Sequence, residues 1–339
     1  PGLPGVRLAP LLEMRKLDAL SDEDMVNMQR SNLLDSSAPN PSVETLLHAF
    51  LPHTFVDHTH ATAFLALANL PDAEAATREI FGDRLAVVPY IMPGFALAKK
   101  AAVVFDANPE CEGLILLKHG HFTFGATARE SYDKVIKHTN MVEDWLAARE
   151  NGRKFDLTVN RNRSLSDPVS AASVLPVLRG AIGRLRGEHH EAAPRPVVMD
   201  VRAGEVIDAF LSRTDLEELS QRGVASPDHV IRTKGRMLVL GKDDLAMGRA
   251  GIEARITEFA EAYRDMFAAQ NQRVGGGKTM LEPYPCVAWV EGIGIIGIGK
   301  DASAASAAAD IAEQTVEVMS LGEAAGGFHP IGQDDLFDI

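Results

Sequence analysis

The sequence predicts an α/β (α+β) fold in which a layered sheet is flanked by helices. Strand-length apolar segments, such as residues 85–90 and 113–121, alternate with segments whose apolar residues recur at helical spacing. Such alternation is typical of mixed α/β folds. The chain has 339 residues, roughly twice the usual domain length, so we expect two domains, at residues 1–160 and 161–339.

The first half reads as a series of helices interrupted by three strands. Ser21, with an acid three residues later, has the pattern of a helix N-cap, and Ser42 is expected to cap the helix that follows it. The expected helices cover residues 8–20, 21–34, 43–50, 61–69, 72–80, 95–105 and 128–149. The expected strands end near His60, cover residues 85–90, and run from residue 113 to 121 with an extension to residue 125.

A second α/β pattern begins near Val197. A strand is expected at residues 197–200, and helices at 171–185, 205–213, 215–222 and 252–270. Residues 151–196 are otherwise rich in Arg and Ser and read as turns. The pair His189 and His190 lies in a polar stretch, so solvated side chains are favoured over a ligand pair.

The formal net charge of −13 argues against nucleic acid and anionic membranes as partners, since both require clustered cations. The negative net charge does not exclude a small anionic substrate, because a few local groups can bind it within an acidic protein. No apolar run approaches the roughly 18 residues of a membrane span, and no leader-like segment opens the chain, so we expect neither membrane insertion nor secretion. Cys111 and Cys286 lie in or beside apolar runs, as reduced thiols do, which favours the cytoplasm.

The His-x-His pair His58 and His60 is the strongest chemical signal in the chain. At a strand end, the period of two places both imidazoles on one face, where they can share a divalent cation. The alternative is a pair of surface histidines at a strand tip. The choice depends on a third ligand and a base elsewhere in the sequence.

His119 and Glu44 are the candidates for those two roles. His119 ends an apolar run and is followed by Gly120, which permits close approach of the backbone. Three histidines and a nearby acid fit an open catalytic metal site. Glu44 has the alternative role of a first-turn acid favoured by the helix dipole. His121 could lie behind the ligands, and we expect His138 on a solvated helix face.

These motifs together resemble the class II aldolase and adducin head family. The resemblance rests on Pro41-Ser42-x-Glu44 with His48, on His58-x-His60, and on Lys118-His119-Gly120 leading to Gly125 and a helix. It is strongest for the aldolase part of bifunctional rhamnulose-1-phosphate aldolase and short-chain dehydrogenase proteins. It implies that His58, His60 and His119 bind Zn²⁺ or another divalent metal, that Glu44 is the acid/base residue, and that Ser42 contacts the substrate phosphate.

The sequence departs from the family pattern in two ways. Family members usually begin with another segment, whose Gly-Asn and Gly-Ser/Thr loops complete the phosphate-binding site. This sequence does not contain such a segment, so we expect phosphate binding to depend on residues outside it. Val43 also stands where many sugar-phosphate aldolases have a second serine.

The resemblance predicts a zinc-dependent aldolase that cleaves a ketose 1-phosphate, such as rhamnulose 1-phosphate, to dihydroxyacetone phosphate and an aldehyde. A sugar-phosphate epimerase or decarboxylase of the same family uses the same metal and stays an alternative. A non-catalytic interaction domain, as in adducin, is the alternative from another class. The family also implies a homo-oligomer whose small-molecule partner is a sugar phosphate.

The second half is expected to be a degenerate copy of the first. Aligning residues 286–297 with 114–125 makes two glycines coincide, and places Glu291 at the position of His119. Aligning residues 228–229 with 57–58 makes an Asp-His pair coincide. If the copy is real, its metal site has been lost, and an unrelated strand order in the two halves would contradict it.

Two glycine motifs in the second half are weaker signals. Residues 292–297 match the dinucleotide fingerprint G-x-G-x-x-G, but too few residues follow for the remaining βαβ units. Residues 275–279 resemble a phosphate-binding loop without its first glycine or its preceding strand, so we expect a turn.

Overall fold

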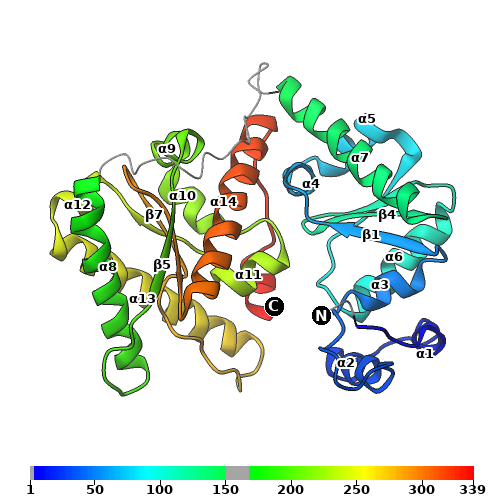
Figure 1. Ribbon diagram of the computed structural model, residues 1–339, viewed down its shortest axis with the longest axis horizontal. Helices are drawn as coiled ribbons and strands as arrows, with labels where there is room; N and C mark the ends of the chain where they lie inside the picture. The colour runs from blue at the N-terminus through cyan, green and yellow to red at the C-terminus, as the bar shows by residue number, and fades with distance from the viewer. Residues whose placement is uncertain (1–3, 150–167) are drawn as a thin grey trace. The chain divides into compact units, whose positions relative to one another are not determined.

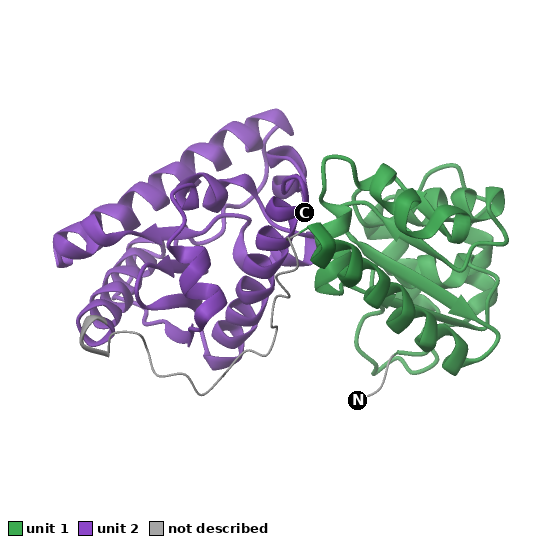
Figure 2. Cartoon of the chain, turned by 90° about the horizontal axis from the view of Figure 1, so that it is seen from above, with its two compact units in different colours: residues 1–149 green, residues 150–339 purple. Residues whose placement is uncertain are grey.

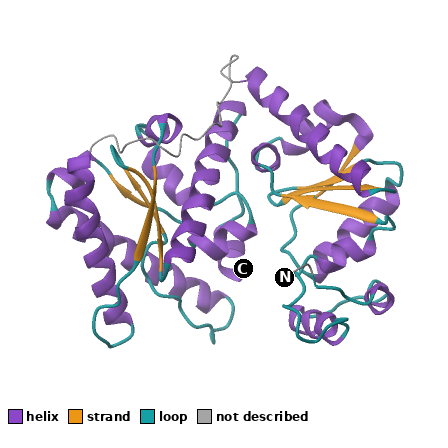
Figure 3. Cartoon of the chain, in the orientation of Figure 1, coloured by secondary structure: helices purple, strands orange, loops and turns teal. Residues whose placement is uncertain are grey.

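The computed structural model describes residues 4–149 and 168–339 (Figure 1). The chain divides into two compact units, Pro1–Arg149 and Glu150–Ile339 (Figure 2). Each unit is a mixed α/β fold with one four-stranded sheet and flanking helices, so the expected fold class is confirmed (Figure 3). The expected boundary after residue 160 lies outside the described residues.

The sheet of unit 1 has the order β1-β4-β3-β2. Its strands are β1 (Phe55–Thr59), β2 (Leu85–Val88), β3 (Gly113–Leu116) and β4 (Gly120–Gly125). β4 is antiparallel to both of its neighbours, and β2 is parallel to β3. β4 is therefore a central strand, and all six of its residues are buried.

Helices cover both faces of this sheet. Alternate residues of β4 point to opposite faces, so they pack against different helices. Phe122 and Phe124 join a core with α3 (Thr45–Phe50) and α6 (Phe95–Ala107). His121 and Thr123 lie on the other face, where α7 (Ala128–Arg149) packs against β4 and β1. The remaining helices are α1 (Leu8–Met14), α2 (Asp22–Ser31), α4 (Thr62–Ala68) and α5 (Ala73–Phe81), with a 3₁₀ turn at Gly82–Arg84.

Local capping agrees with the sequence in one place and differs in another. The Ser21 side chain accepts a hydrogen bond from the Asp24 amide and caps α2, as expected. Ser42 instead accepts from the amide of Glu44, and α3 begins at Thr45, with Glu44 as its N-cap residue. Glu44 is thus not a first-turn acid.

The run from residue 113 to 125 is two strands rather than one extended strand. The chain reverses at Leu117, Lys118 and His119, and Lys118 has a φ of 58°. Apolar residues continue on both sides of the turn because both strands are buried on both faces, so hydrophobicity alone does not reveal the reversal. His119 therefore lies in a hairpin turn.

Unit 2 has a sheet of the same order, β5-β8-β7-β6. Its strands are β5 (Val198–Arg202), β6 (Leu238–Leu240), β7 (Val287–Val290) and β8 (Gly294–Gly299). β8 is antiparallel to β5 and β7, and β6 is parallel to β7. The strand order and the pairing senses of the two units are therefore the same, as the hypothesis of a degenerate copy requires.

The helices of unit 2 also lie on both faces of its sheet. α8 (Pro168–His189) and α13 (Arg249–Arg273) share one core with the sheet, and α14 (Ala302–Ala325) packs against β8 and β5. The shorter helices are α9 (Glu205–Leu211), α10 (Leu216–Arg222), α11 (Pro227–Thr233), α12 (Lys242–Ala246) and α15 (Gln333–Asp338). No helix of the described part of the chain could cross a membrane, and Cys111 and Cys286 are free.

The residue correspondence expected between the two halves is wrong. Asp228 and His229 lie in α11, whereas the strand that corresponds to β1 is β5. In the hairpins, Gly120 pairs with Leu116 and Gly294 pairs with Val290. His119 therefore corresponds to Ile293 rather than Glu291.

The glycine motif at residues 292–297 spans this second hairpin. It forms a turn between antiparallel strands, whereas a dinucleotide fingerprint joins a strand to a helix. Gly275, Gly276 and Gly277 all have positive φ in the loop after α13, as expected for a turn.

Candidate metal centre

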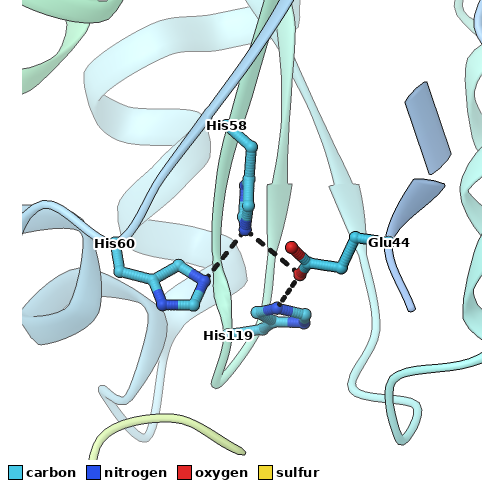
Figure 4. Close-up of side chains that lie close together, drawn as sticks. All are labelled: Glu44, His58, His60 and His119. Atoms are coloured by element: carbon cyan, nitrogen blue, oxygen red, sulfur yellow. Dashed lines mark hydrogen bonds and ion pairs between the residues drawn. The ribbon is translucent and has the colours of Figure 1, made fainter. Parts of the chain in front are cut away.

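Four side chains from separate parts of unit 1 point toward one another (Figure 4). They are Glu44 at the start of α3, His58 on β1, His60 just after β1, and His119 in the turn between β3 and β4. Each offers one ligand atom, and these atoms all lie within 4.8 Å of one another. The structure thus brings together the acid and the three histidines expected from the sequence.

The contacts centre on two atoms. Glu44 Oε1 lies 2.7 Å from His119 Nε2 and 3.3 Å from His58 Nε2. His58 Nε2 also lies 2.9 Å from His60 Nε2. The His119 side chain is buried, and those of Glu44 and His58 are largely buried. The cluster is therefore shielded from most solvent, which strengthens electrostatic interactions within it.

His58 is oriented by its second ring nitrogen. Its Nδ1 lies 3.0 Å from the backbone oxygen of His121, which can only accept a hydrogen bond. Burial lowers the pKa of His58, so the ring is neutral near pH 7 and its single proton is on Nδ1. The lone pair of Nε2 then points into the cluster, as in many metal-binding histidines.

Glu44 is held as a carboxylate. Burial raises the pKa of its carboxyl group, but the contacts with His119 and His58 lower it by more, so the pKa lies well below its usual range. One carboxylate oxygen and three imidazole nitrogens that lie within 4.8 Å of one another are ligand atoms that zinc binds, so the donor set fits a divalent metal such as zinc.

Gly120 allows these groups to meet. A Cβ atom at this position would lie 2.7 Å from His60 Cδ2, 2.8 Å from His58 Cε1 and 2.9 Å from the backbone oxygen of Thr59. These separations are shorter than van der Waals contacts, so a side chain here would displace two of the proposed ligands.

Four further residues lie near the cluster, and two of them, His138 and Glu112, were predicted wrongly or not predicted from the sequence. Ser42 is exposed, two residues before Glu44. His138 is fully buried on α7, so the expectation of a solvated helix face is wrong. Its partners are His121, which is also fully buried, and Glu112. Glu112 precedes a strand that is distant in sequence from α7, and its pairing with His138 has no local signal in the sequence.

Comparisons with known protein families cover most of the chain. The family description "Class II Aldolase and Adducin N-terminal domain" matches residues 14–146, and "Aldolase class II, second domain" matches residues 169–339. The two matches divide the chain much as its compact units do.

A curated relative is the "Uncharacterized oxidoreductase YuxG" of Bacillus subtilis (strain 168), which is 28% identical over 346 residues. The match covers 99% of this chain and 48% of the relative, so the chain spans about half the length of the relative.

Two solved structures are similar to parts of the chain. The N-terminal class II aldolase domain of a conserved protein from Thermoplasma acidophilum is 40% identical with a TM-score of 0.40, covering 42% of this chain and 66% of that chain. An aldolase II superfamily protein from Pseudomonas syringae is 18% identical with a TM-score of 0.30, covering 36% and 53%.

Proposed function

The chain belongs to the class II aldolase and adducin family, and from this premise we propose that it is a zinc-dependent aldolase. Its reaction is the reversible cleavage of a ketose 1-phosphate, such as rhamnulose 1-phosphate, to dihydroxyacetone phosphate and an aldehyde. The observation that carries the proposal is the convergence of three imidazole nitrogens and one carboxylate oxygen within 4.8 Å. A non-catalytic role would not require this donor set.

His58, His60 and His119 would hold the metal, and Glu44 would stay beside it as the acid/base group. The metal would supply Lewis-acid polarisation of the carbonyl and hydroxyl oxygens of the substrate. The neutral His58 ring presents its Nε2 lone pair because its Nδ1 proton is committed to the His121 carbonyl oxygen. The side chains of His58, His119 and Glu44 are largely buried, which limits the access of water to the reacting carbon.

Glu44 would transfer the proton that the reaction requires. In cleavage, the carbon–carbon bond breaks, the aldehyde forms from a hydroxyl group that loses its proton, and the other fragment is left as an enediolate. The Glu44 carboxylate would take up the proton that the hydroxyl group loses and deliver it to the carbon of that fragment, and the reverse transfer would serve the direction of synthesis. The hydroxyl group of Ser42 is proposed to donate a hydrogen bond to the substrate phosphate, because Ser42 is exposed near Glu44.

The proposal is tested with zinc-loaded protein and rhamnulose 1-phosphate. Dihydroxyacetone phosphate is measured by its NADH-dependent reduction with a coupling enzyme, and the sugar products are separated by chromatography. Release of dihydroxyacetone phosphate supports the aldolase. An epimeric sugar phosphate or carbon dioxide would instead indicate an epimerase or a decarboxylase. Full zinc occupancy of the full-length protein without turnover of any ketose 1-phosphate would contradict the aldolase.

We further propose that the protein acts in the cytoplasm as a homo-oligomer. The free thiols Cys111 and Cys286 support a reducing compartment. Light scattering coupled to size-exclusion chromatography measures the oligomeric state, and a mass of one chain, 36.6 kDa, would contradict the oligomer.

A further inference from the structure

A line of three polar groups, of which the two histidines are fully buried, lies on the side of the unit 1 sheet opposite the metal ligands. Glu112 Oε2 lies 2.9 Å from His138 Nε2, and His138 Nδ1 lies 3.2 Å from His121 Nε2. We infer that Glu112, His138 and His121 form a positioning chain that orients His58 for metal binding. The inference rests on the metal site of the proposed function, but it does not depend on the reaction catalysed.

The direction of the hydrogen bonds follows from the carboxylate. Glu112 is ionised, because the hydrogen bond from His138 lowers the pKa of its carboxyl group, and a carboxylate only accepts. His138 Nε2 therefore donates to Glu112. Burial lowers the pKa of His138, so the ring is neutral and its Nδ1 accepts from His121 Nε2. Each ring in the chain thus has one defined tautomer.

The positioning chain contacts His58 through the backbone of β4. The carbonyl oxygen of His121 accepts the hydrogen bond from His58 Nδ1, at 3.0 Å. The His121 ring on the opposite face is held between α4 and α7: it stacks on Phe64, with ring centroids 3.8 Å apart, and it bonds to His138. Holding this side chain fixes the position of the carbonyl group that selects the tautomer of His58.

Core packing alone does not account for these residues. His121 and His138 are both fully buried among aromatic rings, including Phe64 and Phe81. Burying a polar ring costs free energy unless its hydrogen bonds are made, and apolar residues of similar size would fill the same space without that cost.

Unit 2 shows that the same fold forms without the positioning chain of polar residues. The strand registers and the packing of Gly125 and Gly299 against α7 and α14 define the corresponding positions. The positions of Glu112, His138 and His121 are taken by Cys286, Ala312 and Ile295. Those of His58, His60 and His119 are taken by Val201, Ala203 and Ile293. The positioning chain and the proposed metal ligands are thus both present in unit 1, and both are replaced in unit 2.

The test compares zinc affinity among variants of the full chain in the absence of substrate. His121→Leu removes the bond to His138 and should raise the zinc dissociation constant tenfold or more, about the loss typical of groups that orient metal ligands. His121→Gln places an amide near the former Nε2 position and should restore most of the affinity. Thr123→Val is the matched control, because Thr123 is buried on the same face of β4 and bonds to α7 through the Ser131 carbonyl oxygen.

The control separates positioning from general stability. Thr123→Val should lower the melting temperature and leave the zinc dissociation constant within about twofold. The inference is overturned if His121→Leu lowers the melting temperature in the same way without a change in zinc affinity. The absorption spectrum of the Co²⁺-substituted protein gives a second readout, which should change in His121→Leu and not in Thr123→Val.

A partly exposed member of the chain gives a test that does not depend on core folding. Glu112→Ala removes the acceptor of His138 and should weaken zinc binding, whereas Lys137→Ala removes only the 3.3 Å ion pair on Glu112 and should not. Equal affinities in these two variants would contradict the inference. If wild-type protein binds zinc and the variants lose affinity, but no aldolase activity is found, the proposed function fails and the positioning chain stands.

Discussion

Glu44 combines two properties that an acid/base residue requires, a defined position and contact with the reacting centre. It is the N-cap residue of α3, so the helix fixes its backbone. Its Oε1 atom contacts both His119 and His58. Because three histidines remain without it, the metal site and the proton-transfer group can be separated by mutation.

Glu44→Gln should reduce kcat by about 10²–10⁴-fold and leave zinc bound, because the amide keeps the shape of the side chain but cannot exchange the proton. Zinc content by elemental analysis and turnover of the ketose 1-phosphate measure the two effects. His119→Ala is the paired variant and should lose both. Retention of wild-type turnover in Glu44→Gln would exclude this acid as the proton-transfer group.

Gly120→Ala should impair zinc binding, because the added Cβ meets His60, His58 and Thr59 at less than 3 Å. Competition with a coloured chelator measures the affinity. Gly204→Ala is a suitable control, since no atom lies within 4 Å of its Cβ position and its φ of 170° is open to any residue. Equal zinc affinity in both variants would show that the ligands adapt to a side chain at position 120.

Glu317 on α14 should make stability depend on pH. Burial and the nearby Glu313 raise the pKa of its carboxyl group from 4.5 to about 7. The folded state therefore binds a proton that the unfolded state has released, and this contribution to stability is lost as the pH rises from about 4.5 to about 7. Glu317→Gln should raise the melting temperature relative to wild type more at about pH 8 than at about pH 5. A difference independent of pH would contradict the raised pKa.

At the scale of elements, the two β-hairpins use the same geometry with different residues. Lys118 and Gly292 stand at the same turn position with φ of 58° and 77°. The amides of His119 and Ile293 make the same bonds back to Leu116 and Val290. A left-handed conformation costs a residue other than glycine about 1–2 kcal/mol. Lys118, which precedes His119 in the turn, therefore destabilises unit 1 relative to a glycine at that position.

Gly292→Ala should lower the free energy of unfolding by about 1 kcal/mol, because alanine is strained at positive φ. Nothing lies within 4 Å of the added Cβ, so the effect is one of backbone conformation alone. Denaturant unfolding measures it, with Gly204→Ala as the control at an unstrained position. A loss no larger than in the control would indicate that the turn relaxes.

At the scale of the molecule, one topology occurs twice, and among the described residues the groups that could hold a metal come together in unit 1 only. The shared strand order and pairing senses support the proposal that unit 2 is a degenerate copy of unit 1. At the ligand positions of unit 2, Ile293 is buried and Val201 is partly buried against the core, so apolar side chains pack there without a cation.

The chain should therefore bind one zinc ion. Equilibrium dialysis followed by elemental analysis should give one zinc per wild-type chain and none per chain of His58→Ala. Two tightly bound ions would show that unit 2, or residues outside the described part of the chain, provides a second site.

Much of the architecture was predictable because it depends on local patterns. The alternation of strands and helices, the cap at Ser21 and the long helix Ala128–Arg149 follow from nearest neighbours in sequence. The reversal between β3 and β4 was not predictable in this way, because two buried strands joined by a three-residue turn read as one apolar run. The burial of His138 was missed for a similar reason: the helical pattern does not show that Glu112 and His121 approach from other elements.

The sequence by itself determined the fold class and the identity of the candidate ligands, because strand and helix periods and the His-x-His spacing are local properties. Only the tertiary structure decided that Glu44 and His119 meet this pair, since residues 75 positions apart approach through sheet pairing and helix packing. It also decided that His121 supports His58 from the opposite face of β4, and that the corresponding strand of unit 2 is β5. Such relations depend on strand register, which is set by the packing of the whole unit.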